Sequence, residues 1–407
     1  MTGISKTTVR FFTVACAALF SMAAFAAQYG PGVTDDTIKI GNTSPYSGPA
    51  SAYGVIGKAV SAYFDMINDQ GGINGRKIEF ISYDDGYSPP KTVEQARRLV
   101  EQDHVLLLFE TLGTPTNSAI HKYMNAKKVP QLFVATGASK WGQPEKYPWT
   151  MGWQPSYKTE AQIYAKYALA NIKDPKIAIL YQNDDYGKDY VNGFKEGLGD
   201  KTNLIVAEES YEVNEPTIAS QIVNLKNSGA NVFLNVTTPK FAAQAIKKAY
   251  EIGWKPTQFI NNVSISTSAV LEPAGLDAST GLISAGYLKD QTDPQWKNTP
   301  EVKEWEAWMK KYFPDGNLAD GSNVYGYTIA QTMVHVLKMA GDNLTRENVM
   351  KQAANIDNLE LPLLLPGIKV DTGPKDYYPI ECMQLQRFDG QKWSRFGDVV
   401  CAETPDT

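Results

Sequence analysis

The stretch Val105-Leu106-Leu107-Leu108-Phe109 is an unbroken apolar run of strand length. Such a run is typical of a parallel strand that is covered on both faces of its sheet. Upstream of it, β-rich runs at 37–42 and 77–84 alternate with segments of helical period at 55–70 and 91–102. Repeated strand–helix–strand units build a parallel sheet through right-handed crossovers. The first part of the chain is therefore predicted to be an open α/β layer.

The same rhythm starts again near Tyr157. We expect helices at 159–171, 187–198, 216–227 and 240–252, and strands at 176–182, 204–211, 231–236, 258–262 and 281–287. The stretch 141–155 between the two series is dense in aromatic residues and prolines, and we interpret it as the crossing between two lobes. The predicted fold class is α/β, with two doubly wound parallel-sheet lobes.

The last third of the chain returns to helical period at 301–312, 322–340 and 346–356, and a β-rich tail follows at 378–400. Asp389-Gly390 within this tail predicts a hairpin turn, because Asp-Gly readily adopts the backbone that tight hairpins require. Patterning alone does not assign these elements to either lobe.

Composition excludes several classes of protein. The chain of 407 residues is 43% hydrophobic and 20% charged, which argues against disorder, collagen and coiled coil. It carries 39 basic and 44 acidic residues without a basic block, so we expect no nucleic-acid partner. Its three His and three Cys are scattered, with no spacing that would gather several ligands around one ion, so we expect no metal site.

The N-terminus has the features of a secretory signal. Lys6 and Arg10 precede an apolar run at 11–25, and small residues follow it, so we expect residues 1–26 to be removed by cleavage close to Ala26. The alternative is a membrane anchor, but about 15 apolar residues are too few to cross a hydrocarbon core of ~30 Å. The predicted location is the periplasm, and Cys16 leaves with the signal.

Two cysteines, Cys382 and Cys401, then remain in an oxidising compartment. We predict a disulfide between them, which would stabilise the fold by roughly 3 kcal/mol by closing the loop between them. The alternative is a pair of unrelated buried thiols.

Five short motifs occur in one order along the chain. They are Ile38-Lys39-Ile40-Gly41, Pro45-Tyr46-Ser47-Gly48, Ile67-Asn68-Asp69-Gln70-Gly71-Gly72-Ile73-Asn74-Gly75-Arg76, Tyr83-Asp84-Asp85 and Asn183-Asp184-Asp185-Tyr186-Gly187. With the signal before them, these motifs resemble the type I periplasmic solute-binding proteins of ABC importers, typified by the leucine/isoleucine/valine-binding proteins. The resemblance covers nearly the whole mature chain.

The resemblance implies two lobes joined by three hinge strands, with a small solute trapped between them and a membrane permease as partner. It places the first lobe at 34–153 plus about 288–374, and the second at 154–287 plus about 375–400. The patterning agrees independently, because ligands of open parallel sheets lie beyond the carboxyl ends of the strands. We expect a monomer that needs no cofactor.

The residues beyond strand ends supply candidate ligand contacts. The loop after the first strand offers Tyr46, Ser47 and Tyr53, and Thr114 precedes Pro115 at a helix start, where a carboxylate is stabilised. The resemblance implies that Thr114 and Ser139 hold the ligand carboxylate, although simple helix capping is the alternative for both. The candidates for hydrogen bonds from the second lobe are Asn235, Thr237 and Asn262.

The chemistry of the ligand follows from what the second lobe lacks. Amino-acid binders of this family pair the ligand ammonium with an acid after the strand that follows Gly253, and here that strand reads Phe259-Ile260-Asn261-Asn262-Val263-Ser264. An unpaired ammonium in a dry cleft is costly, so an α-amino acid is disfavoured unless Asp184, Asp185 or Glu160 substitutes.

Aromatic side chains on the expected loops point to an aromatic guest, because ring pairs add about 0.5–1.5 kcal/mol beyond burial. Tyr46, Tyr53, Trp153 and Tyr186 are the candidates, and the alternative is that these rings pack the hinge. The leading ligand is therefore an aromatic carboxylate, with an amino acid or an amide as the alternative.

Other functional classes receive less support. We expect no catalytic residues, since no Gly-x-Ser-x-Gly elbow, phosphate loop or dinucleotide glycine fingerprint occurs. Sensing for a membrane receptor is a second alternative, and it would require a partner to carry the signal.

Overall fold

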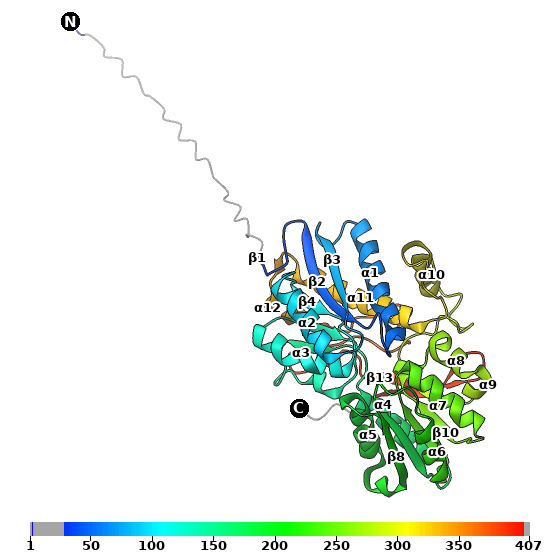
Figure 1. Cartoon of the computed structure of the whole chain (residues 1–407). Coiled ribbons are helices and arrows are strands. Elements are labelled where there is room, and N and C mark those ends of the chain that lie inside the picture. Colours follow the sequence, from blue (N-terminus) through cyan, green and yellow to red (C-terminus); the bar gives the residue numbers. More distant parts are fainter. Residues whose placement is uncertain (1, 3–27, 403–407) are drawn as a thin grey trace.

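The computed structural model describes residue 2 and residues 28–402. Apart from residue 2, the predicted signal segment lies outside the described residues. The chain folds into two α/β lobes, which confirms the predicted fold class. In Figure 1 the lobe with β2, β3 and α1 lies above the lobe with α5, α6 and β8.

The sheet of the first lobe has the order β3-β2-β4-β5-β6, and all of its ladders are parallel. Its strands are β2 (Thr37–Ser44), β3 (Lys77–Asp84), β4 (Leu107–Phe109), β5 (Gln131–Val134) and β6 (Thr150–Gly152), and its helices are α1 (Gly54–Asp69), α2 (Pro89–Glu101) and α3 (Thr114–Lys127). The whole run 105–109 is buried, as expected for a strand with both faces covered, although only its last three residues join the ladder.

The predicted crossing at 141–155 is too long. Its residues Thr150–Gly152 form the edge strand β6, and Gln131 of β5 lies opposite Thr150. Because β6 is so short, it produced no strand pattern between the flanking prolines and aromatic residues. The passage to the second lobe follows β6.

The sheet of the second lobe has the order β14-β13-β11-β10-β9-β7-β8, parallel except for β13 and β14. Its strands are β7 (Ile177–Gln182), β8 (Ile205–Tyr211), β9 (Val232–Val236), β10 (Thr257–Ile260), β11 (Ile283–Gly286), β13 (Cys382–Phe388) and β14 (Trp393–Cys401). Its helices are α4 (Tyr157–Asn171), α5 (Asp185–Leu198), α6 (Ala219–Asn227), α7 (Pro239–Glu251), α8 (Glu272–Ala274) and α9 (Leu276–Ser279).

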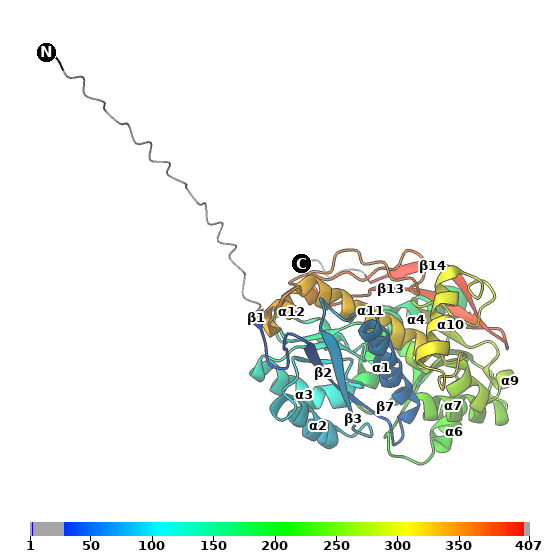
Figure 2. The same cartoon turned by 90° about the horizontal axis from the view of Figure 1, so that it is seen from above.

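Three helices of the last third return to the first lobe. They are α10 (Pro300–Tyr312), α11 (Gly321–Ala340) and α12 (Arg346–Ala353), and α10 and α11 pack against α1 (Figure 2). The rings of Tyr63 on α1 and Tyr327 on α11 meet edge to face, 4.9 Å apart. A short parallel pair, β1 (Gln28–Tyr29) with β12 (Asn343–Leu344), ties the start of the described chain to the same region.

The chain passes between the two sheets three times, after β6, after β11 and before β13. The hairpin of β13 and β14 completes the second sheet, and its turn contains Asp389 and Gly390, as predicted. Gly390 has a φ of 101°, and Asp389 accepts hydrogen bonds from the backbone N–H of Gln391 and Lys392. A disulfide joins Cys382 to Cys401, which face each other across this hairpin.

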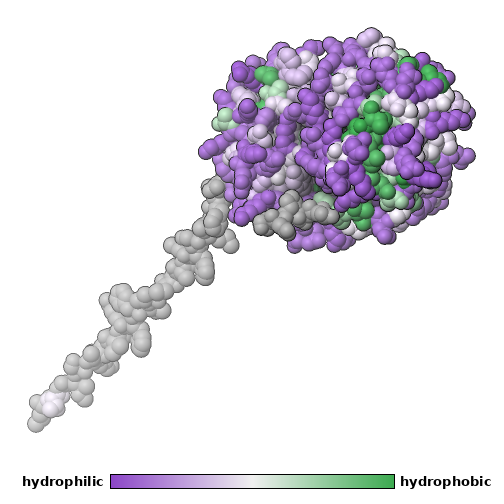
Figure 3. Space-filling model, turned by 90° about the horizontal axis from the view of Figure 1, so that it is seen from below, coloured by the Kyte–Doolittle hydropathy of each residue, from purple (hydrophilic) through white to green (hydrophobic). Residues whose placement is uncertain are grey.

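The surface is mainly hydrophilic on the face shown in Figure 3, with a hydrophobic strip across it. In the described part of the chain, no helix has the length and apolar character that a membrane crossing requires.

Candidate functional site

A cavity of about 160 Å³ lies between the two lobes. Its walls come from segments that follow the carboxyl ends of strands in both sheets, where ligands of parallel sheets are expected. From the first lobe and the passage after β6, these residues are Tyr87 after β3, Gly113 and Thr114 after β4, Ala135 after β5 and Gln154 after β6. From the second lobe, they are Tyr186 after β7, Thr238 after β9, Asn262 after β10 and Tyr287 after β11.

The wall after β4 is the start of α3. Thr114 is the first residue of this helix and Gly113 is its N-cap, which corrects the expectation that Thr114 caps it. The Thr114 hydroxyl instead shares a hydrogen bond of 2.6 Å with the hydroxyl of Thr136. Gly113 has a φ of 100°, and a Cβ there would come within 2.5 Å of the Tyr87 ring. The tight turn brings the positive end of the α3 dipole to the cavity.

Tyrosine rings make up much of the wall, and they come from both lobes and the passage between them: Tyr53, Tyr87, Tyr157, Tyr186, Tyr287 and Tyr325. The rings of Tyr157 and Tyr186 meet edge to face, with centroids 5.3 Å apart. Burial raises the pKa of Tyr157 to about 12, so its hydroxyl stays protonated at neutral pH. The hydroxyls of Tyr186 and Tyr325 are buried and have no hydrogen-bond partner among the described residues.

The wall after β10 is held by a buried carboxyl. Glu160 of α4 accepts hydrogen bonds from the hydroxyls of Tyr164 and Tyr190, at 2.6 and 2.8 Å. It also accepts from the backbone N–H of Asn262 at 2.8 Å and from the Asn262 side-chain amide. Burial raises the pKa of Glu160 to about 7, even though these donors favour the charged form. Asn262 therefore faces the cavity from a fixed position.

Two hydrogen bonds and an ion pair join the two lobes. The Tyr53 hydroxyl donates to the carbonyl of Val263 at 3.0 Å, and the Ser266 hydroxyl donates to Asp320 at 3.0 Å. Near the passage between the lobes, Lys140 forms an ion pair with Asp185 at 2.7 Å. These contacts enclose the cavity between the lobes.

Of the residues predicted to contact a ligand, four line the cavity: Tyr53, Thr114, Tyr186 and Asn262. The other six lie outside its lining. On the first lobe, the Tyr46 hydroxyl pairs with Ser82 at 2.6 Å, and the Ser47 hydroxyl donates to Asp84 at 2.5 Å. Both side chains are engaged within their own lobe, away from the space between the sheets.

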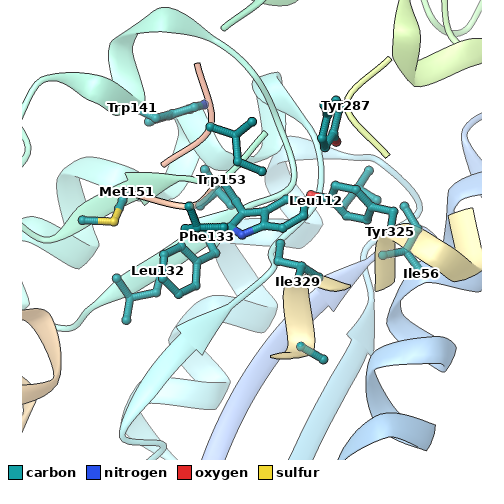
Figure 4. Packing of buried hydrophobic residues seen from close by; sticks show 14 of the residues in the cluster. Ile56, Leu112, Leu132, Phe133, Trp141, Met151, Trp153, Tyr287, Tyr325 and Ile329 are labelled. Atoms are coloured by element: carbon teal, nitrogen blue, oxygen red, sulfur yellow. The ribbon is translucent and has the colours of Figure 1, made fainter. Parts of the chain in front are cut away.

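The remaining four also have partners elsewhere. Ser139 donates through its N–H and its hydroxyl to Asp189, at 2.6 and 2.8 Å. The hydroxyl of Thr237 donates to Asn235 Oδ1 at 2.6 Å, whereas the Asn235 side-chain nitrogen is buried and has no partner among the described residues. Trp153 is fully buried and donates to the Thr332 hydroxyl at 3.0 Å, and Figure 4 shows its ring packed among apolar side chains.

The three acids that could have paired with a ligand ammonium are likewise engaged by other groups of the protein. Glu160 holds Asn262, and Asp184 caps α5 by accepting from the backbone N–H of Tyr186 and Gly187. Asp185 is paired with Lys140. In the described ranges, no group of three or more His, Cys, Asp or Glu is arranged to hold a metal ion.

A family model described as periplasmic binding protein matches residues 37–392. The chain belongs to the periplasmic binding protein family. Leu/Ile/Val-binding protein homolog 1 of Brucella suis biovar 1 (strain 1330) is 26% identical over 338 residues, which are 81% of this chain and 86% of that protein.

Two solved structures share the fold of this periplasmic binding protein. A branched chain amino acid ABC transporter from Thermus thermophilus with bound valine has a TM-score of 0.81 at 16% identity, covering 91% of this chain and 98% of that one. A solute binding protein of an ABC transporter from Rhodopseudomonas palustris BisB5, in complex with 3,4-dihydroxy benzoic acid, has a TM-score of 0.75 at 22% identity, covering 90% and 98%.

Several wall residues of this periplasmic binding protein were not predicted from the sequence. Tyr87 lies just beyond a predicted strand, and its neighbour Gly86 was a turn signal that could have identified it. Tyr287 is the last residue of the predicted strand 281–287. It is therefore an aromatic residue at the carboxyl end of a strand, which is the criterion that selected Tyr186. Tyr325 lies within α11, and nothing local indicates that this helix borders the cavity.

Proposed function

We propose that this periplasmic binding protein captures a small aromatic carboxylate between its lobes and delivers it to the permease of an ABC importer. The observation that carries the proposal is the wall itself, where six tyrosine rings surround a cavity that also receives the start of α3. Aromatic rings stack favourably on aromatic rings, and a helix N-terminus favours an anion.

The size of the cavity suits such a solute. The cavity has a volume of about 160 Å³, which is suited to a small solute. A benzoate or a cinnamate is a molecule of this size.

Three groups near one another could receive the carboxylate. The first N–H groups of a helix have no acceptor within the helix, and those of α3 begin at Thr114. The Tyr186 hydroxyl is buried and has no partner in the part of the chain that the structure describes, and its ring meets that of Tyr157 edge to face. The hydroxyl of Thr114 adds a third donor, which it now shares with Thr136.

Closure of the lobes around the solute would give the permease a distinct surface to recognise. Contacts across the cavity, such as that from Tyr53 to Val263, join the lobes only when the cavity is shut. The complex of the R. palustris protein with 3,4-dihydroxy benzoic acid supports the aromatic class, since a protein of this fold accepts such a guest.

Calorimetric titration of the mature protein tests the proposal. Benzoate, cinnamate and hydroxybenzoates should bind, and a ligand at 100 times its Kd should raise the free energy of unfolding by ~2.7 kcal/mol. Thr114→Val should raise the Kd for aromatic acids by about 10-fold, because one donor to the carboxylate is lost. Ser47→Ala, which removes a hydroxyl outside the cavity, is the matched control. Binding of leucine or valine without binding of any aromatic acid would overturn the proposal.

A further inference from the structure

Asp290 is a residue of the cavity wall with one carboxyl oxygen that lacks a donor among the described residues. It lies in the segment after β11 and is part of the cavity wall. Its Oδ1 accepts hydrogen bonds from the N–H and the hydroxyl of Thr292, at 2.8 and 2.7 Å. Its Oδ2 is buried and accepts no hydrogen bond from any described residue. Thr292 therefore fixes the carboxyl group through Oδ1, while Oδ2 has no donor among the described residues.

The nearby cations are committed to other acids. The ammonium of Lys289 contacts Glu301 at 2.6 Å and the carbonyl of Pro362 at 2.7 Å. Lys392 and Arg395 contact the buried carboxyl of Asp293, at 3.0 and 3.5 Å.

The charge of Asp290 acts to raise the pKa of Arg395, but the Arg395 guanidinium donates its hydrogen bond to Gln295, at 2.9 Å. No hydrogen bond from these cations reaches Asp290 in the described chain. Among the described residues that line the cavity, Asp290 is the only acid.

A buried acceptor without a donor is costly, and proteins seldom keep one without a use. We propose that Asp290 Oδ2 accepts a hydrogen bond from a donor group of the solute, such as a hydroxyl or an ammonium. This inference rests on the proposed function only in assuming that the solute occupies this cavity. For an aromatic carboxylate, it specifies a hydroxylated aromatic acid, with its hydroxyl directed to Asp290.

The proposal also revises the argument from the missing second-lobe acid. In the amino-acid binders of this family the acid is expected after the strand that follows Gly253, whereas Asp290 lies in the segment after β11 and lines the cavity. An ammonium would therefore also find an acceptor here. Pairs of ligands that differ only in one donor group show whether the hydrogen bond to Asp290 comes from a hydroxyl or from an ammonium.

The experiment compares two ligand pairs by calorimetry on the mature protein: 4-hydroxybenzoate against benzoate, and leucine against 4-methylpentanoate. In one pair the member with the donor should bind about 10-fold more tightly to the native protein. Asp290→Ala should reduce that preference to below about 2-fold while leaving the member without a donor unchanged. Asp290→Asn retains the shape of the side chain and should weaken the preference as well. Asp200→Ala, at an exposed position, is the control.

The outcomes separate the two proposals. A preference confined to leucine, lost in Asp290→Ala, would uphold the role of Asp290 and overturn the aromatic function. The absence of a preference in both pairs, or a preference that survives in Asp290→Ala, would overturn the role of Asp290, and binding of the two benzoates would then leave the aromatic function standing. Absence of binding by all four compounds would overturn both. Circular dichroism of each variant confirms that it is folded.

Discussion

Glu160→Gln should change how the stability of the protein depends on pH. Glu160 is fully buried between α4 and the loop after β10, and its four donors come from Tyr164, Tyr190 and Asn262. Burial raises the pKa of its carboxyl from 4.5 to about 7. Between these two pH values the folded state binds more protons at this group than the unfolded state does. The contribution of Glu160 to stability is therefore full below pH 4.5 and is lost as pH rises through about 7.

The magnitude follows from that difference in pKa. Each pH unit corresponds to about 1.4 kcal/mol, so the contribution lost amounts to about 3 kcal/mol. Glutamine does not titrate, and its single oxygen can still accept from one of the two tyrosine hydroxyls. The free energy of unfolding of Glu160→Gln, taken relative to that of the native protein, should thus be about 2.5 kcal/mol higher at pH 8 than at pH 5, because a small part of the contribution is already lost at pH 5.

Urea unfolding of both proteins at pH 5 and pH 8 measures this double difference. Other buried acids, such as Glu381, also have a raised pKa, but their contribution is common to both proteins and cancels. Glu251→Gln, at an exposed helix position, is the control and should give a difference near zero. If the two proteins differ by the same amount at both pH values, the carboxyl of Glu160 does not titrate as its burial requires.

Two further predictions concern stability alone. Replacing Cys382 and Cys401 together by Ser should lower the free energy of unfolding by about 3 kcal/mol, because the unfolded chain regains the entropy of the open loop; no change in urea unfolding on substitution would contradict this. Gly187→Ala should destabilise by more than about 3 kcal/mol, since the added Cβ would lie 2.0 Å from the Gln182 carbonyl oxygen. Gly321→Ala, where a Cβ meets no atom within 4 Å, is the comparison, and equal thermal unfolding of the two variants would refute the steric argument.

The layered fold could be predicted because parallel strands with both faces covered have a local signature. The run 105–109 and the strand Val232–Val236 are both wholly buried, and both are apolar almost throughout. The crossing between the lobes has no such signature. Its position depends on whether the three residues Thr150–Gly152 pair with β5, and that pairing is decided by the surrounding sheet.

The candidate site was predictable to the extent that it follows the ends of strands. Thr114 and Tyr186 lie in the segments that follow the predicted strands 105–109 and 176–182, Asn262 ends the predicted strand 258–262, and all three line the cavity. Tyr46 also follows a strand, but its hydroxyl turns to Ser82 within the first lobe. Strand ends therefore locate the rim of the cavity, while the direction of each side chain depends on neighbours that are distant in sequence.

Trp153 illustrates how a residue outside the cavity can still bear on its contents. Its ring meets those of Tyr287 and Tyr325 edge to face, at 6.0 and 5.3 Å, and both of these tyrosines line the cavity. Trp153 follows β6 and Tyr287 follows β11, so these two rings stand at two of the three passages between the lobes (Figure 4).

A rotation of one lobe against the other must alter the backbone at these passages, and closely packed rings cannot follow it independently. Trp153, from the aromatic stretch 141–155, thus joins two tyrosines of the cavity wall to a passage between the lobes.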